Sequence, residues 1–421
     1  MWLRGLGSLC WALALGASAC DSPSAAPAAT TTGTVSAPVS ARDEALQLRL
    51  DAVLDAAIGE ERIVGTMVIV ARDGAVVYRR AAGFADREAR RPVRDDTLFR
   101  YASLTKPLVS AAALALVDAG KLGLDDPVAQ WLPAFKPRLA DGRTPVITVR
   151  QLLTHTAGLT YNFFEREGGP YHRAKVSNGF DDARISLDEN LARISEVPLA
   201  YEPGTRWGYS VAIDVLGGVV AKAGGGSLEE VVRRLVTEPL GMEAAFSAVD
   251  RARVATPYAD GAPRPLRMAD PQSIPYVGSP MIFSPSRSFD DRAFASGGAG
   301  MTGTAGDYLK FLEAIRTGGA PILKPETARA MTSNQIGSID VRIMSGGKWR
   351  WGFGFALLDA PEPGGTPQAA GTYRWGGVYG NHFFVDPAQK LSVIVLTNTA
   401  LAGMSGAFPD AVLRAVYGPA L

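Results

Sequence analysis

The sequence predicts an α/β (α+β) fold in which one antiparallel sheet, formed from both ends of the chain, is flanked by helices and joined to a mainly helical subdomain. Two observations predict it. Strand-like runs occur over residues 66–78 and again over 352–397, whereas the stretch from 103 to about 290 combines helical patterns with long loops. Because the strands lie near the two ends, we expect those ends to meet in one sheet.

The first strand pair is predicted around Asp73-Gly74, since Asp-Gly between the apolar runs Thr66–Ala71 and Ala75–Tyr78 is a strong hairpin signal. An apolar run from Leu108 to Val117 is typical of a buried helix, and Gly120 ends it. The later elements are a helix over Ala305–Ile315, strands over Gly352–Leu358, Tyr373–Trp375, His382–Val385 and Leu391–Thr397, and a closing helix over Ala407–Val416.

The first 19 residues are typical of a signal peptide. Arg4 supplies a positive start, residues 6–15 form an apolar stretch, and Ala17 and Ala19 are small residues that suit a cleavage site. The sequence therefore predicts export from the cytoplasm.

Cys20 is a candidate for lipidation, because cleavage before it resembles bacterial lipoprotein processing. Ala17 departs from the Leu that such sites usually carry, and simple secretion after the Ala-x-Ala pattern is the alternative. Residues 20–43 are rich in Pro, Ala, Thr and Ser and behave as a tether, which favours an anchored periplasmic lipoprotein. Residues 44–421 then form the folded domain.

Composition narrows the class of partner. The chain has 421 residues, 47% of them hydrophobic, and a formal net charge of +1, so it lacks the basic excess of a nucleic-acid binder. Small-molecule substrates are favoured, and a membrane is expected only through the N-terminal lipid. Both cysteines lie in the first 20 residues and the three histidines have no ligand spacing, so no metal or cofactor is predicted. The sequence does not indicate an oligomeric state.

Ser103 and Lys106 are the candidate nucleophile and base. Positions three apart share a helix face, so the Lys106 amine can approach the Ser103 hydroxyl at the start of the predicted helix. An unprotonated amine can take the hydroxyl proton, and the positive end of the helix favours the developing alkoxide. The pairing predicts a serine hydrolase that works without histidine.

The same Ser-x-x-Lys pattern occurs at Ser345 and Lys348. This second copy lies in a glycine-rich stretch with no helix behind it, so we predict a loop. Two fixed residues arise by chance in a chain of this length, and the assignment to Ser103 depends on further motifs downstream.

Those motifs are Leu152–Leu159, Glu202–Ser210 and the glycine-rich Ser296–Gly300. With Ser103 and Lys106 they resemble the serine hydrolase family that contains class C β-lactamases, D-alanyl-D-alanine carboxypeptidases and family VIII carboxylesterases. The resemblance covers residues 44–421 and implies a β-lactamase/transpeptidase-like fold. It also implies that Tyr209 is the proton partner of the lysine. Where the β-lactamases carry Tyr-x-Asn, this chain has Val211, an apolar side chain.

A second departure concerns the Lys-Thr-Gly strand, which in the family recognises a substrate carboxylate. Here the corresponding residues are Trp375, Gly376 and Gly377, which the resemblance implies as substrate-binding residues. The backbone amides of Ser103 and Val378 are the implied oxyanion hole. An indole binds a carboxylate less well than a cation does, so both departures favour uncharged esters.

The resemblance therefore implies a carboxylesterase that acts through an acyl-enzyme on small or medium acyl esters. A β-lactamase or D-amino-acid peptidase is the alternative, with Arg374 as the cation that would bind an anionic substrate. An acyltransferase, or a binding protein that has lost its chemistry, is the second alternative. A Ser-His-Asp hydrolase built from Ser210, His382 and Asp386 is disfavoured, because a proline-glycine turn precedes Ser210 where a strand would be needed.

Overall fold

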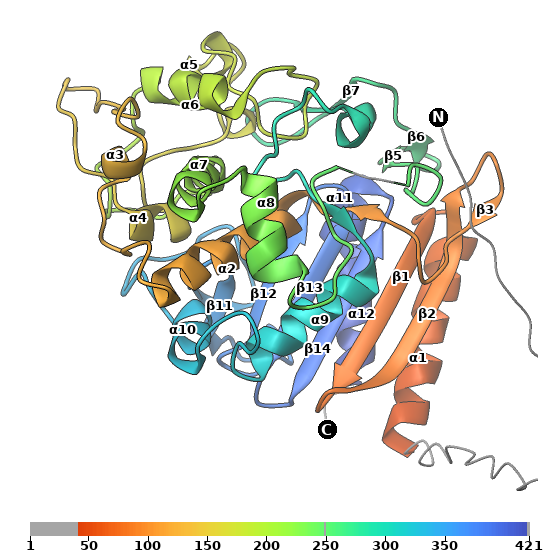
Figure 1. Cartoon of the computed structure of the whole chain (residues 1–421). Coiled ribbons are helices and arrows are strands. Elements are labelled where there is room, and N and C mark those ends of the chain that lie inside the picture. The colour runs from red at the N-terminus through yellow and green to blue at the C-terminus, as the bar shows by residue number, and fades with distance from the viewer. Residues whose placement is uncertain (1–40, 248–249, 419–421) are drawn as a thin grey trace, which may run out of the picture. The chain divides into compact units, whose positions relative to one another are not determined.

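Strands from both ends of the chain form one eight-stranded antiparallel sheet, as the sequence predicts (Figure 1). The computed structural model describes residues 41–247 and 250–418, so the predicted signal peptide and Cys20 lie outside the described residues. The order is β10-β11-β12-β13-β14-β1-β2-β3. The strands are β1 (Gly65–Arg72), β2 (Ala75–Asp86), β3 (Arg91–Pro92), β10 (Gly347–Trp351), β11 (Ala356–Pro361), β12 (Tyr373–Gly377), β13 (Asn381–Asp386) and β14 (Leu391–Thr397).

The contact between β1 and β14 joins the two ends. Thr66 lies opposite Thr397 and Arg72 opposite Leu391. The turn between β1 and β2 has positive φ angles of 50° at Asp73 and 84° at Gly74, which confirms the predicted Asp-Gly hairpin.

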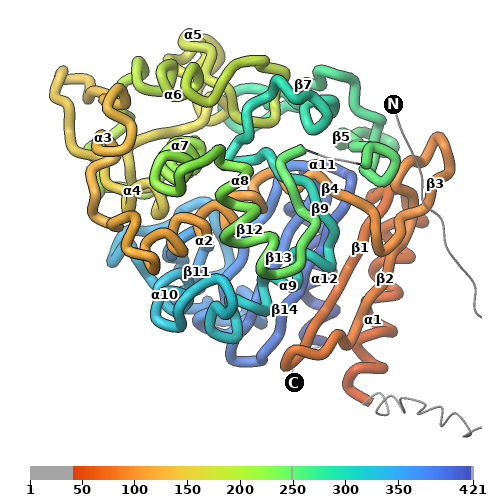
Figure 2. Tube along the Cα trace, in the orientation of Figure 1, coloured from red at the N-terminus to blue at the C-terminus, as the bar shows by residue number. Residues whose placement is uncertain are grey.

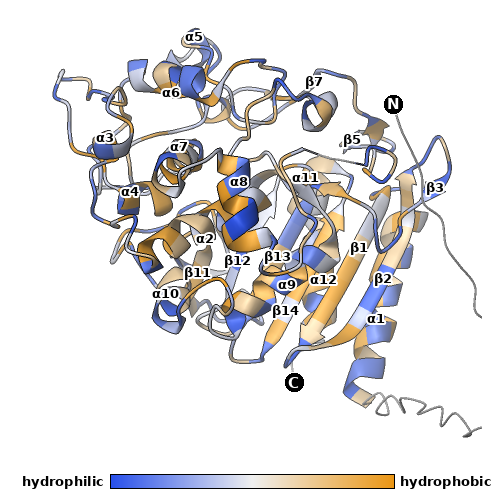
Figure 3. Ribbon diagram, in the orientation of Figure 1, coloured by the Kyte–Doolittle hydropathy of each residue, from blue (hydrophilic) through white to orange (hydrophobic). Residues whose placement is uncertain are grey.

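Helices cover both faces of this sheet. On one face, α1 (Ala41–Gly59) and α12 (Ala407–Tyr417) share a core with Val68 and Val70 of β1. The alternate residues Met67 and Ile69 belong to the larger core on the other face, with α2 (Thr105–Asp118) and α9 (Ala305–Arg316). In Figure 3 the central strands β1 and β14 carry mainly the hydrophobic colour.

The mainly helical subdomain lies beyond α2, at the top of Figures 1 and 2. Its central helix α7 (Ala212–Gly224) is buried over most of its length and packs against α2. The other helices are α3 (Val128–Trp131), α4 (Val149–Leu153), α5 (Pro170–Arg173), α6 (Leu187–Glu196) and α8 (Leu228–Val232). Two short hairpins, β5 (Tyr258–Ala259) with β6 (Leu266–Arg267) and β7 (Gln272–Ile274) with β8 (Met281–Phe283), follow in a region predicted to be helical with insertions.

Two local predictions need correction. Gly352–Leu358 is not one strand, because β10 ends at Trp351 and β11 begins at Ala356. The Gly352 amide donates to the Phe355 carbonyl at 2.9 Å, and Gly354 has φ of +101°, so the two glycines close a turn. The second Ser-x-x-Lys pattern is a loop only at its first half, since Lys348 already belongs to β10. Among the described helices, none is long and apolar enough to span a membrane.

Candidate active site

Ser103 lies in a single 3-10 turn, Ala102–Leu104, that runs directly into α2. Its side chain is buried but reaches the surface with 7% of its area. Ala102 has φ of +47°, a left-handed conformation that is unfavourable for a residue with a Cβ. The turn is fixed on both sides, because Tyr101 donates its hydroxyl to the Thr304 carbonyl and its amide to the Met301 carbonyl. The predicted nucleophile therefore occupies a strained turn held by its surroundings.

Lys106 follows in the first turn of α2 and is 1% exposed. Its Nζ donates to Ser103 Oγ at 3.2 Å and to the Gly298 carbonyl at 2.7 Å. Burial lowers the pKa of Lys106 to about 7, while the nearby Asp214 acts in the opposite direction. A large share of this amine is therefore unprotonated at neutral pH, as a general base requires.

Tyr209 comes from the segment before α7 and faces the same point. The Lys106 Nζ lies 4.7 Å from the centre of its ring, and its hydroxyl accepts a hydrogen bond from Trp375 Nε1 at 3.1 Å. Burial raises the pKa of Tyr209, whereas the Ser103 hydroxyl and the Trp375 indole lower it. The structure thus brings together Ser103, Lys106 and Tyr209, and their catalytic roles remain predictions.

The strand β12 carries Trp375, Gly376 and Gly377 next to this group. The Trp375 indole uses its single donor on Tyr209 and packs edge-on against Trp351, with ring centres 4.6 Å apart. Its geometry supports a role in holding the tyrosine, in addition to the predicted substrate contact.

The two glycines allow close packing of β12. A Cβ at Gly377 would come within 2.3 Å of the Tyr101 carbonyl, and one at Gly376 would meet Met404 at 2.7 Å. Gly377 therefore lets the strand approach the turn that carries Ser103. Val378 follows directly, and within the described residues its amide donates no hydrogen bond, so it is available as an oxyanion donor.

Arg374 does not supply a cation on this side of the sheet. Successive side chains of a strand point to opposite faces, and Trp375 points to Tyr209. Burial lowers the pKa of Arg374, and the acidic group that opposes this shift is Asp410 of α12, the helix on the other face. The position of Arg374 therefore does not support the alternative in which this residue binds a substrate anion.

A cavity of about 830 Å³ opens beside Tyr209. Its walls come from the segment Thr205–Tyr209, from Phe164 and Thr160 of the helical subdomain, and from the loop that contains Ser338–Asp340, Arg342 and Ile343. The sequence favours two long irregular inserts as substrate walls, an aromatic one over residues 161–180 and one over residues 256–290 that is rich in Pro, Ser, Tyr and Met. Both inserts are near this site, since Phe164 and Tyr276 pack with ring centres 6.1 Å apart. The 338–343 loop was not predicted as a wall of the site.

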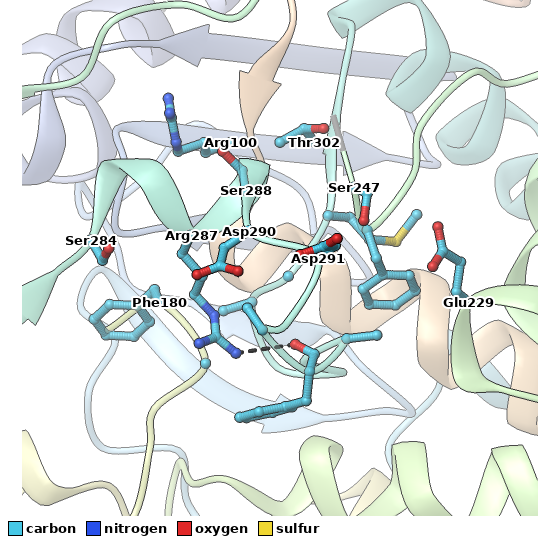
Figure 4. A pocket seen from close by; sticks show the side chains of 18 of the residues that line it. Arg100, Phe180, Glu229, Ser247, Ser284, Arg287, Ser288, Asp290, Asp291 and Thr302 are labelled. Atoms are coloured by element: carbon cyan, nitrogen blue, oxygen red, sulfur yellow. Dashed lines mark hydrogen bonds between the residues drawn. The ribbon is translucent and has the colours of Figure 1, made fainter. Parts of the chain in front are cut away.

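A smaller cavity of about 100 Å³ is lined by Arg100, Arg287 and the segment Ala299–Thr302 (Figure 4). The Arg287 guanidinium is engaged by backbone carbonyls, including Phe294 at 3.0 Å, and Arg100 donates to Ala255 and Pro285 carbonyls. These arginines hold loops together. None of the three predicted catalytic side chains lines this cavity, so we assign the substrate site to the larger one.

The Ser-His-Asp alternative is not assembled. Ser210 pairs with His155 Nδ1 at 3.2 Å, whereas His382 Nδ1 pairs with the Gly403 carbonyl. Asp386 instead accepts from Tyr417 and two backbone amides. No cluster of three metal-ligating side chains occurs in the part of the chain that the structure describes.

Comparison with known proteins identifies the family. The family described as Beta-lactamase matches residues 50–416. The chain belongs to the β-lactamase family. It is a serine hydrolase of that family, with the β-lactamase/transpeptidase-like fold that the sequence resemblance implied.

Three relatives bear on its activity. Esterase EstB of Burkholderia gladioli is 50% identical over 379 residues, which cover 89% of this chain and 95% of that protein. The solved structure of EstCE1, a hydrolase with promiscuous acyltransferase activity, has a TM-score of 0.87 and 42% identity, and covers 90% of this chain and all of that one. Acyltransferase calJ of Penicillium decumbens is 28% identical over 78% of this chain and 82% of its own length.

Proposed function

We propose that this protein is a carboxylesterase that forms an acyl-enzyme on Ser103 from small or medium acyl esters. One observation carries the proposal: the buried Lys106 amine, whose pKa is lowered to about 7, contacts Ser103 Oγ at 3.2 Å. The similarity to Esterase EstB and EstCE1 supports esters as the substrate class.

In the proposed acylation, Ser103 Oγ attacks the ester carbonyl carbon while Lys106 Nζ accepts the hydroxyl proton. The amides of Ser103 and Val378 stabilise the tetrahedral oxyanion. The bond to the alcohol then breaks as Tyr209 donates its phenolic proton to the leaving alkoxide and regains a proton from Lys106. The acyl group stays on Ser103.

Deacylation repeats these steps with water. Tyr209 and Lys106 take a proton from the water that attacks the acyl carbonyl, and Ser103 leaves with a proton from the same pair. Because Tyr209 serves the leaving group, the cavity beside it receives the alcohol half of the ester. Its lining combines Phe164, Trp207 and Ile343 with the charged Asp340 and Arg342, so the cavity offers both apolar and polar contacts to that alcohol.

Esters are proposed over β-lactams and D-amino peptides because β12 brings no cation to the site. Trp375 stands at the Lys-Thr-Gly position and directs its donor to Tyr209, and Arg374 lies on the other face. A carboxylate at this edge would find one occupied indole donor in place of an ammonium group.

The test measures turnover of p-nitrophenyl butyrate and of a chromogenic cephalosporin side by side, with Ser103→Ala as the control. The proposal expects fast ester turnover, little cephalosporin loss and an inactive variant. Cephalosporin turnover that exceeds ester turnover would show that this protein is a β-lactamase. Retained turnover in Ser103→Ala would show that no acyl-enzyme on Ser103 is needed.

Acyl transfer is the second candidate function, favoured by the acyltransferase activity named for two of the relatives. Addition of a primary alcohol during p-nitrophenyl butyrate turnover separates the two. A transferase converts much of the butyryl group to the new ester, whereas a strict hydrolase yields butyrate alone.

We also propose that the protein is exported and anchored through a lipid on Cys20, outside the described residues. The basis is the signal-like start and the tether that follows Cys20. Membrane fractionation of the wild type and of Cys20→Ala tests this, since the variant should move to the soluble periplasmic or secreted fraction. A wild type that is already soluble would favour simple secretion.

A further inference from the structure

Asp214 is a buried carboxylate in an apolar helix, close to the predicted base. It is the third residue of α7 and is 0% exposed. Its Oδ1 accepts hydrogen bonds from Ser296 Oγ at 2.6 Å and from the Gly298 amide at 3.2 Å. The described residues give this carboxylate no direct ion pair, and its burial is costly, so these bonds and the helix N-terminus are what offset the cost. The position therefore calls for a specific role.

The carboxylate holds a turn that presses against α7. A Cβ at Gly297 would come within 2.4 Å of the Ile213 carbonyl, and one at Gly298 within 2.5 Å of Asp214 Oδ2. Only glycine fits at these two positions, because larger residues would push the turn away from the helix. The contacts with Ile213 and Asp214 thus explain Gly297 and Gly298 of the Ser296–Gly300 motif.

The same turn sets the direction of the Lys106 amine. The Gly298 carbonyl accepts from Lys106 Nζ at 2.7 Å, while its amide is held by Asp214. A neutral amine has two N–H donors and one lone pair. With one N–H fixed on Gly298, rotation about the terminal bond is restricted. In the neutral amine, the lone pair can then take the place of the N–H that the charged amine donates to Ser103 Oγ, 3.2 Å away.

We propose that Asp214 is a positioning residue for the Lys106 base: it locks the Gly297-Gly298 turn against α7, and the Gly298 carbonyl in turn aims the amine at Ser103. The inference rests on the proposed acyl-enzyme function. It gives the Ser-Gly-Gly segment a task in catalysis although none of its side chains touches the substrate.

Charge adds a second effect. Asp214 raises the pKa of Lys106 against the larger effect of burial, and burial raises the pKa of Asp214 itself. Removal of the negative charge should therefore lower the pKa of the amine further. The titratable and charged groups that face this pair are Ser103, Tyr161, Tyr209, His155 and Arg287, the last of which is drawn in Figure 4.

The experiment compares Asp214→Ala with Asp214→Asn in the full chain, by the pH dependence of kcat and KM for p-nitrophenyl butyrate. Asp214→Ala removes the acceptor, so kcat should fall about 100-fold with KM little changed, the effect of a misplaced catalytic group. Asp214→Asn keeps an acceptor oxygen for Ser296 and Gly298, and should recover much of kcat. Its acid limb should move to lower pH, because the charge that raises the pKa of Lys106 is gone.

The matched control is Asp386→Asn. Asp386 is equally buried and also accepts from a hydroxyl and backbone amides, but it lies at the end of β13 against α12. It should lower stability and leave the pH profile unchanged. Ser296→Ala removes one of the two donors to Asp214 and should have a smaller effect on kcat than Asp214→Ala.

The outcomes separate this inference from the proposed function. One outcome is that the wild type turns over the ester through Ser103 while both Asp214 variants have the kcat and the acid limb of the wild type. In that case Asp214 does not position Lys106, and the proposed acyl-enzyme is unaffected. If wild type forms no acyl-enzyme, the proposed function fails first. Should Asp214→Ala not fold, Ser296→Ala decides, because it removes one of the two bonds to the carboxylate, and a kcat equal to that of the wild type then overturns the proposal.

Discussion

The two Ser-x-x-Lys patterns of this chain share their spacing but differ in local structure and in burial. Ser103 and Lys106 lie in a strained turn and the first turn of a buried helix, with the lysine 1% exposed. Ser345 lies in an exposed loop and Lys348 on the edge strand β10, where its Nζ is 3.8 Å from Asp359 and its side chain is 56% exposed. Spacing alone therefore does not make a nucleophile and base.

The difference lies in what surrounds the amine. Burial lowers the pKa of Lys106 to about 7. Its Nζ bonds to the Gly298 carbonyl and to Ser103 Oγ, which fix the place of the amine. Lys348 faces solvent and a carboxylate, which is the setting of an ordinary surface ion pair. Burial is what converts a lysine into a base at neutral pH.

The largest expected effect is that of Ser103→Ala. Removal of the nucleophile of a catalytic group costs on the order of 10⁴-fold or more in kcat, since the remaining donors stabilise little on their own. Thermal unfolding should change little, because one hydroxyl is lost from a site that stays packed. Turnover of p-nitrophenyl butyrate and a melting curve measure the two quantities. Activity near that of the wild type would show that Ser103 is no more a nucleophile than Ser345.

Lys106→Ala should cost about 10³-fold in kcat, within the range of general-base catalysis. In the wild type, kcat/KM should fall as the pH drops below about 7, because the amine takes up a proton and can no longer accept the one from Ser103. Lys106→Arg is the control, since a guanidinium keeps the charge but stays protonated. A flat profile between pH 5 and 8 would show that Lys106 is not the titrating base.

Trp375→Phe should have an intermediate effect. The variant keeps an aromatic ring against Trp351 but loses the hydrogen bond to the Tyr209 hydroxyl. One neutral hydrogen bond is worth about 1 kcal/mol, so we expect a loss of about 3- to 10-fold in kcat. Trp349→Phe is the matched control, because Trp349 Nε1 donates to the Ser345 carbonyl instead. An equal loss in both variants would indicate general destabilisation.

Much of the site was predictable because its signals are local. The Ser103 and Lys106 pair needs only helical spacing and an apolar run behind it, and the strands β1 and β14 show their β-type patterns over seven or more residues. Tyr209 required a family motif, because nothing in its own neighbourhood distinguishes a catalytic phenol from a packed one.

The rest depends on contacts between distant segments. Ser296 and Asp214 are 82 positions apart, so their hydrogen bond leaves no spacing to read. The one available signal was a carboxylate inside the apolar run Ala212–Gly224. The loop 338–343 was missed for a similar reason, since it has no regular pattern and becomes a wall only when the fold brings it to Tyr209. The turn closed by Gly352 and Gly354 was not predicted, because the residues on both sides of it are buried and form a continuous apolar run in the sequence.

The smallest expected effect is that of Ser345→Ala combined with Lys348→Ala. The loss of one exposed ion pair costs at most about 1 kcal/mol of stability, and the Ser345 carbonyl that accepts from Trp349 remains. We expect kcat and KM for p-nitrophenyl butyrate within about twofold of the wild type, a margin that one surface contact does not exceed. A change in KM alone would indicate that the substrate site extends from the 338–343 loop to Ser345. A large fall in kcat would mean that Ser103 is not the nucleophile. Because the double variant keeps the buried pair intact, it isolates what spacing contributes when burial is absent.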